Sequence, residues 1–401
     1  MASSTLPLRR QIERTFPERP FAVEFWDGSR LDPTGNGGGP KFTVRSPRAL
    51  AHALRAPGQL GLGRAYVAGD IEVDDMDAVV SVLRGWDPPP VGAARKLRLA
   101  LSAARAVGPR MPPPRPDAEL RPRGKLHSKS RDARAVRHHY DVSNEFFSLF
   151  LDRSMTYSCA FFSGGAETLE DAQEHKLELS CQKLELKPGD RVLDVGSGWG
   201  SFAIHAAQRH GAEVVGITLS EPQAELAREL AAEVGVGDRV EFRVMDYRDL
   251  VGERFDAIAS IGMVEHVGES RIDLYAEKLA GMLGPGGRLL NHGITRLRHT
   301  DPGTGPFSDR YVFPDGHPTH LSRVLLALER AGFVTRHVEE YGADYAETLR
   351  HWAARLDDNL DRAVELAGGE RVRVWRLYLR TARSGFESGF ISIYQVRARL
   401  G

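Results

Sequence analysis

Cysteine is almost absent from this chain of 401 residues, which contains only Cys159 and Cys181. Two cysteines cannot form a disulfide framework or a zinc site of four thiolates, and so few are typical of a reducing compartment. No run of about 18 apolar residues occurs, so no segment is expected to span a membrane. The N-terminal residues 1–20 also lack the apolar core of a secretory signal. We therefore expect a cytoplasmic protein.

A net charge is also lacking, because 54 Lys and Arg balance 54 Asp and Glu, yet the charges are unevenly distributed. Residues 91–137 contain 13 basic and three acidic residues, a local net charge of +10. Such asymmetry indicates a polyanionic partner, either nucleic acid or an anionic membrane. Aromatic residues that could stack on bases are absent from this window. We therefore expect the inner face of a membrane as the partner, and no nucleic acid.

The basic window begins with residues 93–107, whose pattern predicts a helix. Leu97, Leu101 and Ala104 share one face of it, and basic residues occupy the others. A basic amphipathic helix suits a membrane surface, but a solvated helix packed on its own domain explains the pattern equally well. The following residues 109–123, rich in Pro and Arg, predict a linker or an ordered loop.

The length of the chain favours two domains, with a boundary near residue 125. Residues 1–124 are expected to form a smaller α+β domain that associates with lipid and includes the basic linker. Strands and helices alternate over residues 125–401, which predicts an α/β domain with a doubly wound, mostly parallel sheet of seven strands. The predicted strands are 191–195, 212–218, 240–245, 255–262, 287–294, 333–339 and 389–396, and the main predicted helices are 168–185, 201–210, 220–235 and 269–283.

A glycine-rich turn follows the first of these strands and reads Asp194-x-Gly196-x-Gly198-x-Gly200. A dinucleotide-binding loop would have Gly-x-Gly-x-x-Gly and an acid about 20 residues further on. Here the second strand ends in Thr218-Leu219-Ser220, without an acid. The loop therefore resembles that of the S-adenosylmethionine (SAM) methyltransferases, in which it holds the methionine end of the cofactor.

Polar residues also follow the second and third strands. Ser220 is placed to cap a helix with Gln223 at capping-box spacing, and Asp246-Tyr247 ends the third strand. Because ligands of such folds bind at the carboxyl ends of the strands, these positions are expected to converge with the glycine turn. The capping role of Gln223 and a contact with the cofactor are compatible interpretations.

Five ordered motifs resemble the cyclopropane fatty-acid synthases and mycolic acid methyltransferases over about residues 125–397. They lie at residues 138–147, 155–160, 262–268, 291–294 and 342–345. The resemblance implies a class I SAM-dependent methyltransferase fold, related to the Rossmann fold. It also implies methyl transfer to the cis double bond of an unsaturated acyl chain, usually in a membrane phospholipid, with a bound bicarbonate ion beside the reacting carbons. No metal ion is implied.

The resemblance maps the family's functional residues onto this sequence. The bicarbonate ligands correspond to Cys159, Glu265, His292, Ile294 and Tyr345. The SAM contacts correspond to Tyr157, Ser158, Asp194, Gly196, Ser197, Gly198, Trp199, Gly200, Thr218, Leu219, Ser220, Gln223, Asp246 and Tyr247. Each has a plain structural alternative: Cys159 as a small core residue, His292 as a core histidine, Tyr345 as an interfacial aromatic, and Trp199 as a packing residue.

The chemistry implied by the resemblance gives reasons for these residue types. An alkene is a weak nucleophile, so it needs alignment with the methyl donor in a dry slot. Attack leaves a carbocation, which the faces of Tyr140, Tyr157 or Phe161 could stabilise by cation–π attraction. A base must then remove a proton, and Glu265 and His292 would orient that base.

Glu145 stands where the cyclopropane enzymes usually carry Asp. Some relatives make a 10-methylene branch, the precursor of 10-methyl, and our hypothesis is that Glu145 marks this branch by stabilising a shifted cation. A cyclopropane product, with Glu145 a neutral exchange or a helix cap, is the alternative. A methylene product calls for a partner reductase, since no second dinucleotide motif occurs. A homodimer is a further expectation, and the more remote functions are a small-molecule methyltransferase and a non-catalytic lipid-binding protein.

Overall fold

The computed structural model describes residues 5–34, 38–109, 113–120, 128–129, 131, 134, 142–299, 305–313, 316 and 318–401. The chain divides into two compact units. The first comprises Met1–Leu120, Gly305–Val312 and Gly368–Ser384, and the second comprises Arg121–Thr304, Phe313–Ala367 and Gly385–Gly401. Two later segments, Gly305–Val312 and Gly368–Ser384, thus belong to the first unit. The predicted boundary near residue 125 assigns both of them to the second domain.

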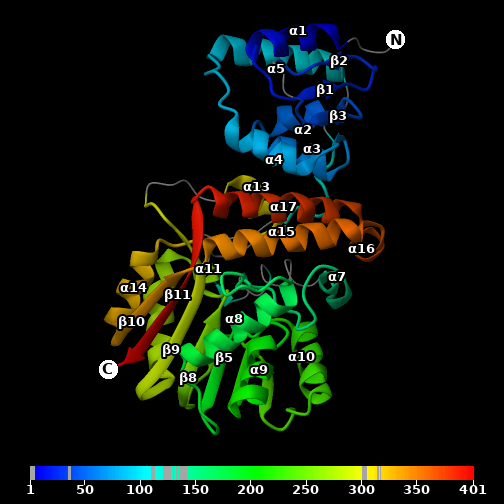
Figure 1. Ribbon diagram of the computed structural model, residues 1–401. Coiled ribbons are helices and arrows are strands. Elements are labelled where there is room, and N and C mark those ends of the chain that lie inside the picture. The colour runs from blue at the N-terminus through cyan, green and yellow to red at the C-terminus, as the bar shows by residue number, and fades with distance from the viewer. Residues whose placement is uncertain are drawn as a thin grey trace. The chain divides into compact units, whose positions relative to one another are not determined.

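The first unit combines a small sheet with helices (Figure 1). Its sheet has the order β2-β1-β3-β4, in which β1 and β3 are parallel. The core contains Leu8, Phe25 and Ala103, and a buried Arg64–Glu119 ion pair with distances of 2.6 and 2.7 Å lies in the same unit. Its elements are α1 (Leu6–Thr15), β1 (Ala22–Glu24), β2 (Arg30–Leu31), β3 (Lys41–Val44), α2 (Arg48–Arg55), α3 (Gln59–Val67), β4 (Ile71–Val73), α4 (Met76–Gly85), α5 (Ala93–Val107), α13 (Pro306–Tyr311) and most of α17 (Gly369–Glu387).

The second unit is built on a seven-stranded sheet of order β10-β11-β9-β8-β5-β6-β7. The strands from β9 to β7 are parallel, and β11 is antiparallel to both β9 and β10. The predicted doubly wound fold and all seven predicted strands are confirmed. The strands are β5 (Arg191–Val195), β6 (Glu213–Thr218), β7 (Val240–Val244), β8 (Phe255–Ile261), β9 (Leu283–Arg296), β10 (Phe333–Glu340) and β11 (Ile391–Leu400).

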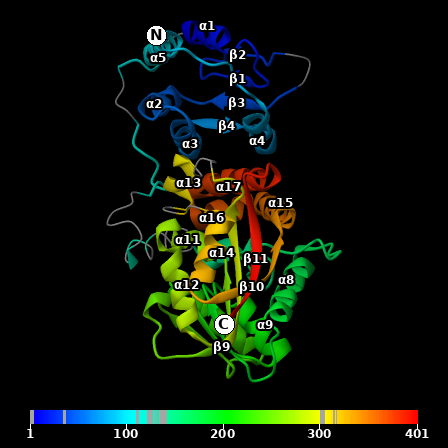
Figure 2. The ribbon, with the colours of Figure 1, turned by 90° about the vertical axis from the view of Figure 1, so that its left-hand side faces the viewer.

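Helices cover both faces of this sheet, and each face has its own core (Figure 2). On β5 the side chains alternate, so that Leu193 and Val195 face one core and Val192 the other. One core includes α12 and α14, and the other includes α8, α9 and α10. The helices of this unit are α7 (Asn144–Ser148), α8 (Leu169–Lys183), α9 (Ser201–His210), α10 (Glu221–Glu233), α11 (Val264–Val267), α12 (Ile272–Gly281), α14 (Leu321–Arg330), α15 (Gly342–Asp358) and α16 (Leu360–Ala367).

No helix is predicted after residue 283, yet the structure forms α13, α14, α15, α16 and α17 there. The pattern was readable in α15, where Leu349, Trp352, Ala353 and Leu356 are buried at helical spacing. Trp352 is fully buried, so α15 packs into the interior of the second unit rather than lying on its surface.

The glycine turn after β5 depends on close packing against Phe242. Gly200 has a φ of +85°, and a Cβ built on it would lie 2.5 Å from the Phe242 ring. Gly216 on β6 faces the same ring, with a corresponding distance of 2.7 Å. The ring of Phe242 therefore fills the space that two glycines leave, and this holds the turn against the sheet.

We predict that Gly200→Ala lowers the free energy of unfolding by about 1–3 kcal/mol more than Gly235→Ala. Both glycines have positive φ, but nothing lies within 4 Å of a Cβ at Gly235, so only Gly200→Ala adds a clash to the backbone strain. Denaturant unfolding of both variants measures the difference. Equal losses would show that Phe242 accommodates the methyl group without strain.

Candidate active site

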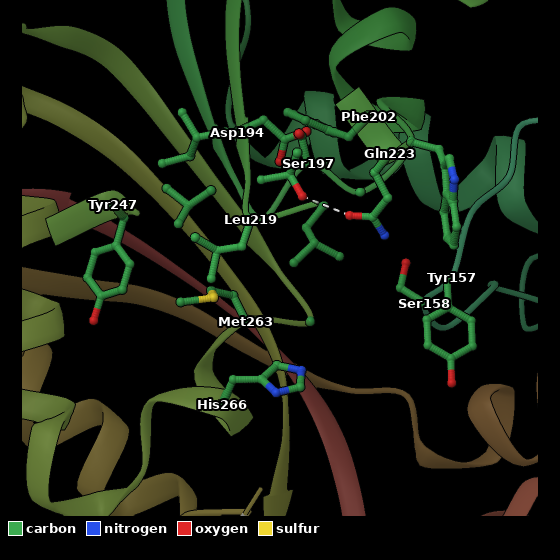
Figure 3. A pocket seen from close by; sticks show the side chains of 18 of the residues that line it. Tyr157, Ser158, Asp194, Ser197, Phe202, Leu219, Gln223, Tyr247, Met263 and His266 are labelled. Carbon is green, nitrogen blue, oxygen red and sulfur yellow. Dashed lines mark hydrogen bonds between the residues drawn. The ribbon is translucent and has the colours of Figure 1, made fainter. Parts of the chain in front are cut away.

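A pocket lies at the carboxyl ends of β5, β6, β7 and β8, and most of the predicted cofactor residues line it (Figure 3). Twelve of the fourteen do so: Tyr157, Ser158, Asp194, Gly196, Ser197, Gly198, Trp199, Thr218, Leu219, Gln223, Asp246 and Tyr247. The other two lie beside it in the chain, Gly200 as the N-cap of α9 and Ser220 as the N-cap of α10. The structure thus brings together residues from four strand ends.

Two buried oxygens of the glycine turn have no hydrogen-bond partner among the described residues. They are Asp194 Oδ2 and Ser197 Oγ, on side chains that are 2% and 7% exposed as residues. Burial raises the pKa of Asp194 to about 7, although the nearby charge of Lys176 acts in the opposite direction. Buried polar atoms normally have partners, so this end of the pocket is arranged for a polar ligand.

The far side of the pocket has defined polar contacts of its own. The Thr218 hydroxyl donates to Gln223 Oε1 at 2.7 Å, which leaves the amide nitrogen of Gln223 facing the cavity. The Asp246 carboxylate accepts from Arg248 Nε at 2.8 Å and from Arg248 N at 2.9 Å. Burial raises the pKa of Asp246, but the hydrogen bonds and charge of Arg248 outweigh burial, so the pKa is lowered overall. The carboxylate is therefore ionised and held at the pocket edge.

Lys176 is a pocket residue that sequence reasoning missed. It is 1% exposed, and its Nζ donates to Ser158 Oγ at 3.0 Å. One turn earlier on α8, Gln173 Nε2 donates to Ser158 O at 2.9 Å and to Thr156 O at 3.3 Å. Burial lowers the pKa of Lys176 to about 8, while Asp152, Cys159 and Asp194 raise it. The sequence predicts the helix, but only its packing shows that Gln173 and Lys176 lie on the buried face.

Glu265 lies on α11, just after the carboxyl end of β8, and His292 lies on the neighbouring strand β9 beside that end. Ile261 pairs with His292, and Gly262 N donates to His292 O at 2.8 Å. Gly293 permits this packing, because a Cβ there would lie 2.1 Å from Val264 Cγ1 and 3.2 Å from Glu265 Oε2. The helix turn that carries Glu265 therefore rests directly on the backbone of β9.

The Glu265 carboxyl and the His292 imidazole each have one buried atom without a partner among the described residues, Oε2 and Nε2 respectively. Burial raises the pKa of Glu265 to about 7, against hydrogen bonds from its own N–H and that of Ile294. Burial also holds the pKa of His292 well below its ordinary value, and the charges of Lys176 and Lys183 add to this. The imidazole is therefore neutral.

Cys159 lies in a loop that α15 anchors. Ala160 N donates to Thr348 Oγ1 at 3.0 Å, and Phe162 N donates to Asp344 Oδ1 at 2.6 Å. The thiol is buried, its Sγ donates to Ala160 O at 3.3 Å, and burial raises its pKa well above the ordinary value. A protonated thiol in this setting is not a nucleophile.

Aromatic rings line the region between the cofactor-type loop and α15. Tyr157 stacks on Trp352 with centroids 5.0 Å apart, and Tyr345 meets the same ring edge-on at 6.0 Å. Phe161 stacks on His292 at 5.8 Å. Tyr345 is itself buried, at 6% exposure. The structure thus groups aromatic rings around Trp352 and places the Phe161 ring against the His292 imidazole.

Three further predicted residues have distinct positions. Trp199 both lines the pocket and packs, since its Nε1 donates to Asn144 Oδ1 at 2.8 Å and its ring lies 4.9 Å from that of Phe147. Glu145 is exposed in the first turn of α7, and hydrogen bonds from its own N–H and from Ser143 lower its pKa. These contacts are those of a helix cap, and a role of Glu145 in the choice of product stays a prediction. Tyr140 lies outside the described residues.

A separate cluster with metal-ligand chemistry occurs on α8 and α9, made of Cys181, His205 and His210. Both imidazoles lie 3.1 Å from the same Glu178 oxygen. Each histidine therefore has a carboxylate partner without an ion.

Comparisons with known proteins place this architecture among lipid-modifying methyltransferases. A family model described as mycolic acid cyclopropane synthetase matches residues 127–396. A probable fatty acid methyltransferase of Pseudomonas putida is 38% identical over 387 residues, covering 94% of this chain and 91% of that protein. The tuberculostearic acid methyltransferase UfaA1 of Mycobacterium tuberculosis is 31% identical over 409 residues, covering 98% and 91%.

Two further matches add a second product class and a ligand. The cyclopropane-fatty-acyl-phospholipid synthase of Escherichia coli is 34% identical over 363 residues, covering 90% of this chain and 88% of that protein. The structure of the mycolic acid cyclopropane synthase CmaA1 complexed with SAH and CTAB has a TM-score of 0.63 at 32% identity. It covers 67% of this chain and 98% of that chain.

We predict that Glu265→Gln gains stability relative to the wild type as the pH rises. The folded-state pKa of Glu265 is about 7 against an ordinary 4.5, so wild-type stability falls through this window because the carboxyl ionises in the unfolded chain while the folded protein keeps its proton. The glutamine has no proton to lose, so the difference in free energy of unfolding should grow by about 3 kcal/mol between about pH 4.5 and about pH 8. Denaturant unfolding in carbonate-free buffer measures it. A difference that does not change with pH would contradict the burial of an unpaired acid.

Proposed function

Since the chain belongs to the mycolic acid cyclopropane synthetase family of SAM-dependent fatty acid methyltransferases, we propose that its acceptor is the cis double bond of an unsaturated acyl chain in a membrane phospholipid. The observation that carries this proposal is the buried pair of unpartnered atoms, Glu265 Oε2 and His292 Nε2, beside the cofactor-type pocket. An acid–imidazole pair in a dry, aromatic-lined site suits proton removal from a carbocation and excludes the water that would trap it.

The pocket fits SAM by its chemistry. Asp194 and Ser197 supply unpartnered oxygens for the charged methionine end, and Gln223 and Asp246 supply polar groups at the opposite side. The glycines of the turn allow close approach of the ligand to the backbone. When bound, SAM supplies an electrophilic methyl group. Lys176 and Gln173 hold the 156–158 segment that forms one wall of the pocket.

We call the surroundings of Glu265 Oε2 and His292 Nε2 the inner site. A bicarbonate ion fits it, because the ion offers both a hydroxyl donor and oxygen acceptors to Glu265 and His292. Bound there, it supplies the base for the proton lost from the added carbon. We assign Glu265 and His292 to holding and orienting this ion, with Cys159, Ile294 and Tyr345 completing its surroundings. The Ile294 N–H already donates to the Glu265 carboxyl, which fixes that side chain.

The aromatic residues would stabilise the positive charge on the acyl chain after methyl attack. Tyr157 and Phe161 are buried or half-buried next to the site, and cation–π attraction is strongest where water is excluded. A role for Tyr140 stays a prediction.

The product depends on what the acyl chain does after the new C–C bond forms. Loss of a proton from the added carbon with ring closure gives a cyclopropane. A hydride shift to the neighbouring cation, followed by loss of the same proton, gives a 10-methylene branch. We propose the methylene product, supported by the UfaA1 relative that spans 98% of this chain. The cyclopropane remains the second candidate, supported by the Escherichia coli relative. The role of Glu145 in this choice, a partner reductase and a homodimer remain predictions.

We predict that the protein converts oleoyl phospholipid vesicles and SAM to a 10-methylene-stearoyl product. The two candidate products have the same mass, so proton NMR of the extracted lipid must distinguish vinylidene protons from ring protons. Glu265→Gln should lose about 10²-fold or more in kcat, whereas Glu269→Gln, an exposed acid on the following turn, should not. Ring protons alone would contradict the methylene assignment, and no methylated lipid would contradict the function.

Peripheral membrane binding is supported by a surface on α5. No helix in the described part of the chain has the length and apolarity needed to cross a bilayer. On α5, Leu97 is 61% exposed and Leu101 47% exposed, and the helix has no acid. Exposed basic residues accompany these leucines: Arg95, Lys96, Arg98 and Arg105. We infer that this surface contacts anionic lipid at the inner face of the membrane.

We predict that Arg95→Glu with Arg98→Glu abolishes flotation with phosphatidylglycerol vesicles at low salt, because it reverses the charge of the α5 surface. Arg336→Glu, an exposed arginine of β10, is the matched control and should leave flotation intact. Activity on detergent-dispersed substrate should be unchanged in both variants. Wild-type flotation that is equal with neutral vesicles would contradict the electrostatic role of α5.

A further inference from the structure

Gln395 lies directly opposite His292 on the neighbouring antiparallel strand β11, and both residues are fully buried. We propose that Gln395, held by Lys183, is a positioning residue that keeps the proton of the neutral His292 ring on Nε2, so that the ring presents an N–H donor to the inner site. The inference rests on the proposed function for the identity of the group that receives this donor. The proton position itself follows from contacts within the chain.

Lys183 determines which way the Gln395 amide points. Its Nζ lies 2.6 Å from Gln395 Oε1, 2.6 Å from Glu339 Oε2 and 2.9 Å from Tyr341 OH. An ammonium group can only donate hydrogen bonds, so the amide atom that faces it must be the oxygen. The three contacts also match the three protons of the ammonium, which leaves Lys183 no freedom to reorient.

Ser180 determines the same orientation independently. Its hydroxyl donates to Lys176 O at 2.7 Å, and its oxygen lies 3.3 Å from Gln395 Nε2. Because the single proton of Ser180 is used on the backbone carbonyl, the oxygen can only accept from Gln395. The amide nitrogen must therefore lie on the side of Ser180 and His292.

The consequence for His292 follows from the same hydrogen-bonding rules. Gln395 Nε2 lies 3.0 Å from His292 Nδ1, and an amide NH₂ can only donate. Nδ1 must then be the unprotonated nitrogen, because a proton there would face a second N–H. Burial and the charges of Lys176 and Lys183 keep the ring neutral, so its one proton is on Nε2.

His292 Nε2 is buried without a partner among the described residues, and so is Oε2 of Glu265. A bare nitrogen in this position would repel an anion, whereas an N–H donor binds it. Gln395 thus acts on the reaction through His292 rather than by touching the substrate. By fixing the tautomer, it provides an oriented N–H donor that stabilises the negative charge of a bound anion.

The direct test is ¹⁵N NMR of the wild-type protein labelled at histidine, with His292 assigned by its loss in His292→Asn. We expect the cross-peak pattern of an Nε2–H tautomer. The pattern of an Nδ1–H tautomer would overturn the proposal. This readout does not require activity, so it is separate from the test of function: an inactive wild type with the Nε2–H pattern would overturn the function and still support the tautomer.

The functional test is Gln395→Glu, whose carboxylate keeps the contact with Lys183 but can only accept from Nδ1. We expect a proton on Nδ1 in its spectrum and a kcat about 10²-fold below the wild type at about pH 9. The loss should shrink as the pH falls, because the imidazolium again has an Nε2–H. The groups around the ring that could also titrate are Lys176, Lys183, Glu339, Tyr341 and Glu265, so the ratio of Gln395→Glu to wild type is the quantity compared.

Arg397→Gln is the matched control on β11, where Arg397 makes an exposed ion pair with Glu185. It should leave kcat, KM and the histidine spectrum unchanged. In Gln395→Glu the KM values should stay close to those of the wild type, since SAM and lipid contacts are intact. A loss in Gln395→Glu that is constant with pH, or accompanied by an unchanged tautomer, would overturn the positioning role.

Discussion

The structure depends on keeping two polar atoms, Glu265 Oε2 and His292 Nε2, buried without a partner from the chain. Each such atom costs about 1–3 kcal/mol in the folded state. A site with this cost persists only on a rigid frame, and the two apolar cores on opposite faces of the sheet provide it. A ligand with complementary donors and acceptors satisfies both atoms when it binds and so removes this cost. A ligand without such groups leaves the atoms unsatisfied, and this difference is the source of selectivity.

One helix connects the two halves of the site. Gln173, Lys176, Ser180 and Lys183 repeat at helical spacing along one face of α8. The first two hold the 156–158 segment of the cofactor-type pocket, and the last two orient Gln395 behind His292. A polar stripe on a largely buried helix is expensive unless its members are bonded; here each of these side chains makes at least one hydrogen bond, although Gln173 Oε1 has no partner among the described residues. The same element thus holds one wall of the cofactor-type pocket and orients the residue behind His292.

The sheet and its pocket could be predicted because they depend on local signals. The strands are short β-branched runs, and the glycine turn follows the first of them in sequence. Glu265 and His292 could be found through ordered motifs. Gln395 could not, because it meets His292 across 103 residues of sequence and its strand reads as an ordinary apolar strand. Lys176 was hidden for a similar reason, since burial of a lysine is known only once the helix is packed. Glu145 was chosen from a substitution pattern; the structure places it at an exposed helix end, and its link to the product stays a prediction.

The central claim is that the unpartnered acid and imidazole form an anion site. A titration of ¹³C-labelled bicarbonate into the wild-type protein, followed by ¹³C NMR, tests it most directly. The account predicts one saturable bound ion per chain, with binding lost in His292→Asn and retained in Arg397→Gln. Absence of a bound signal in the wild type, or an equal signal in His292→Asn, would contradict it.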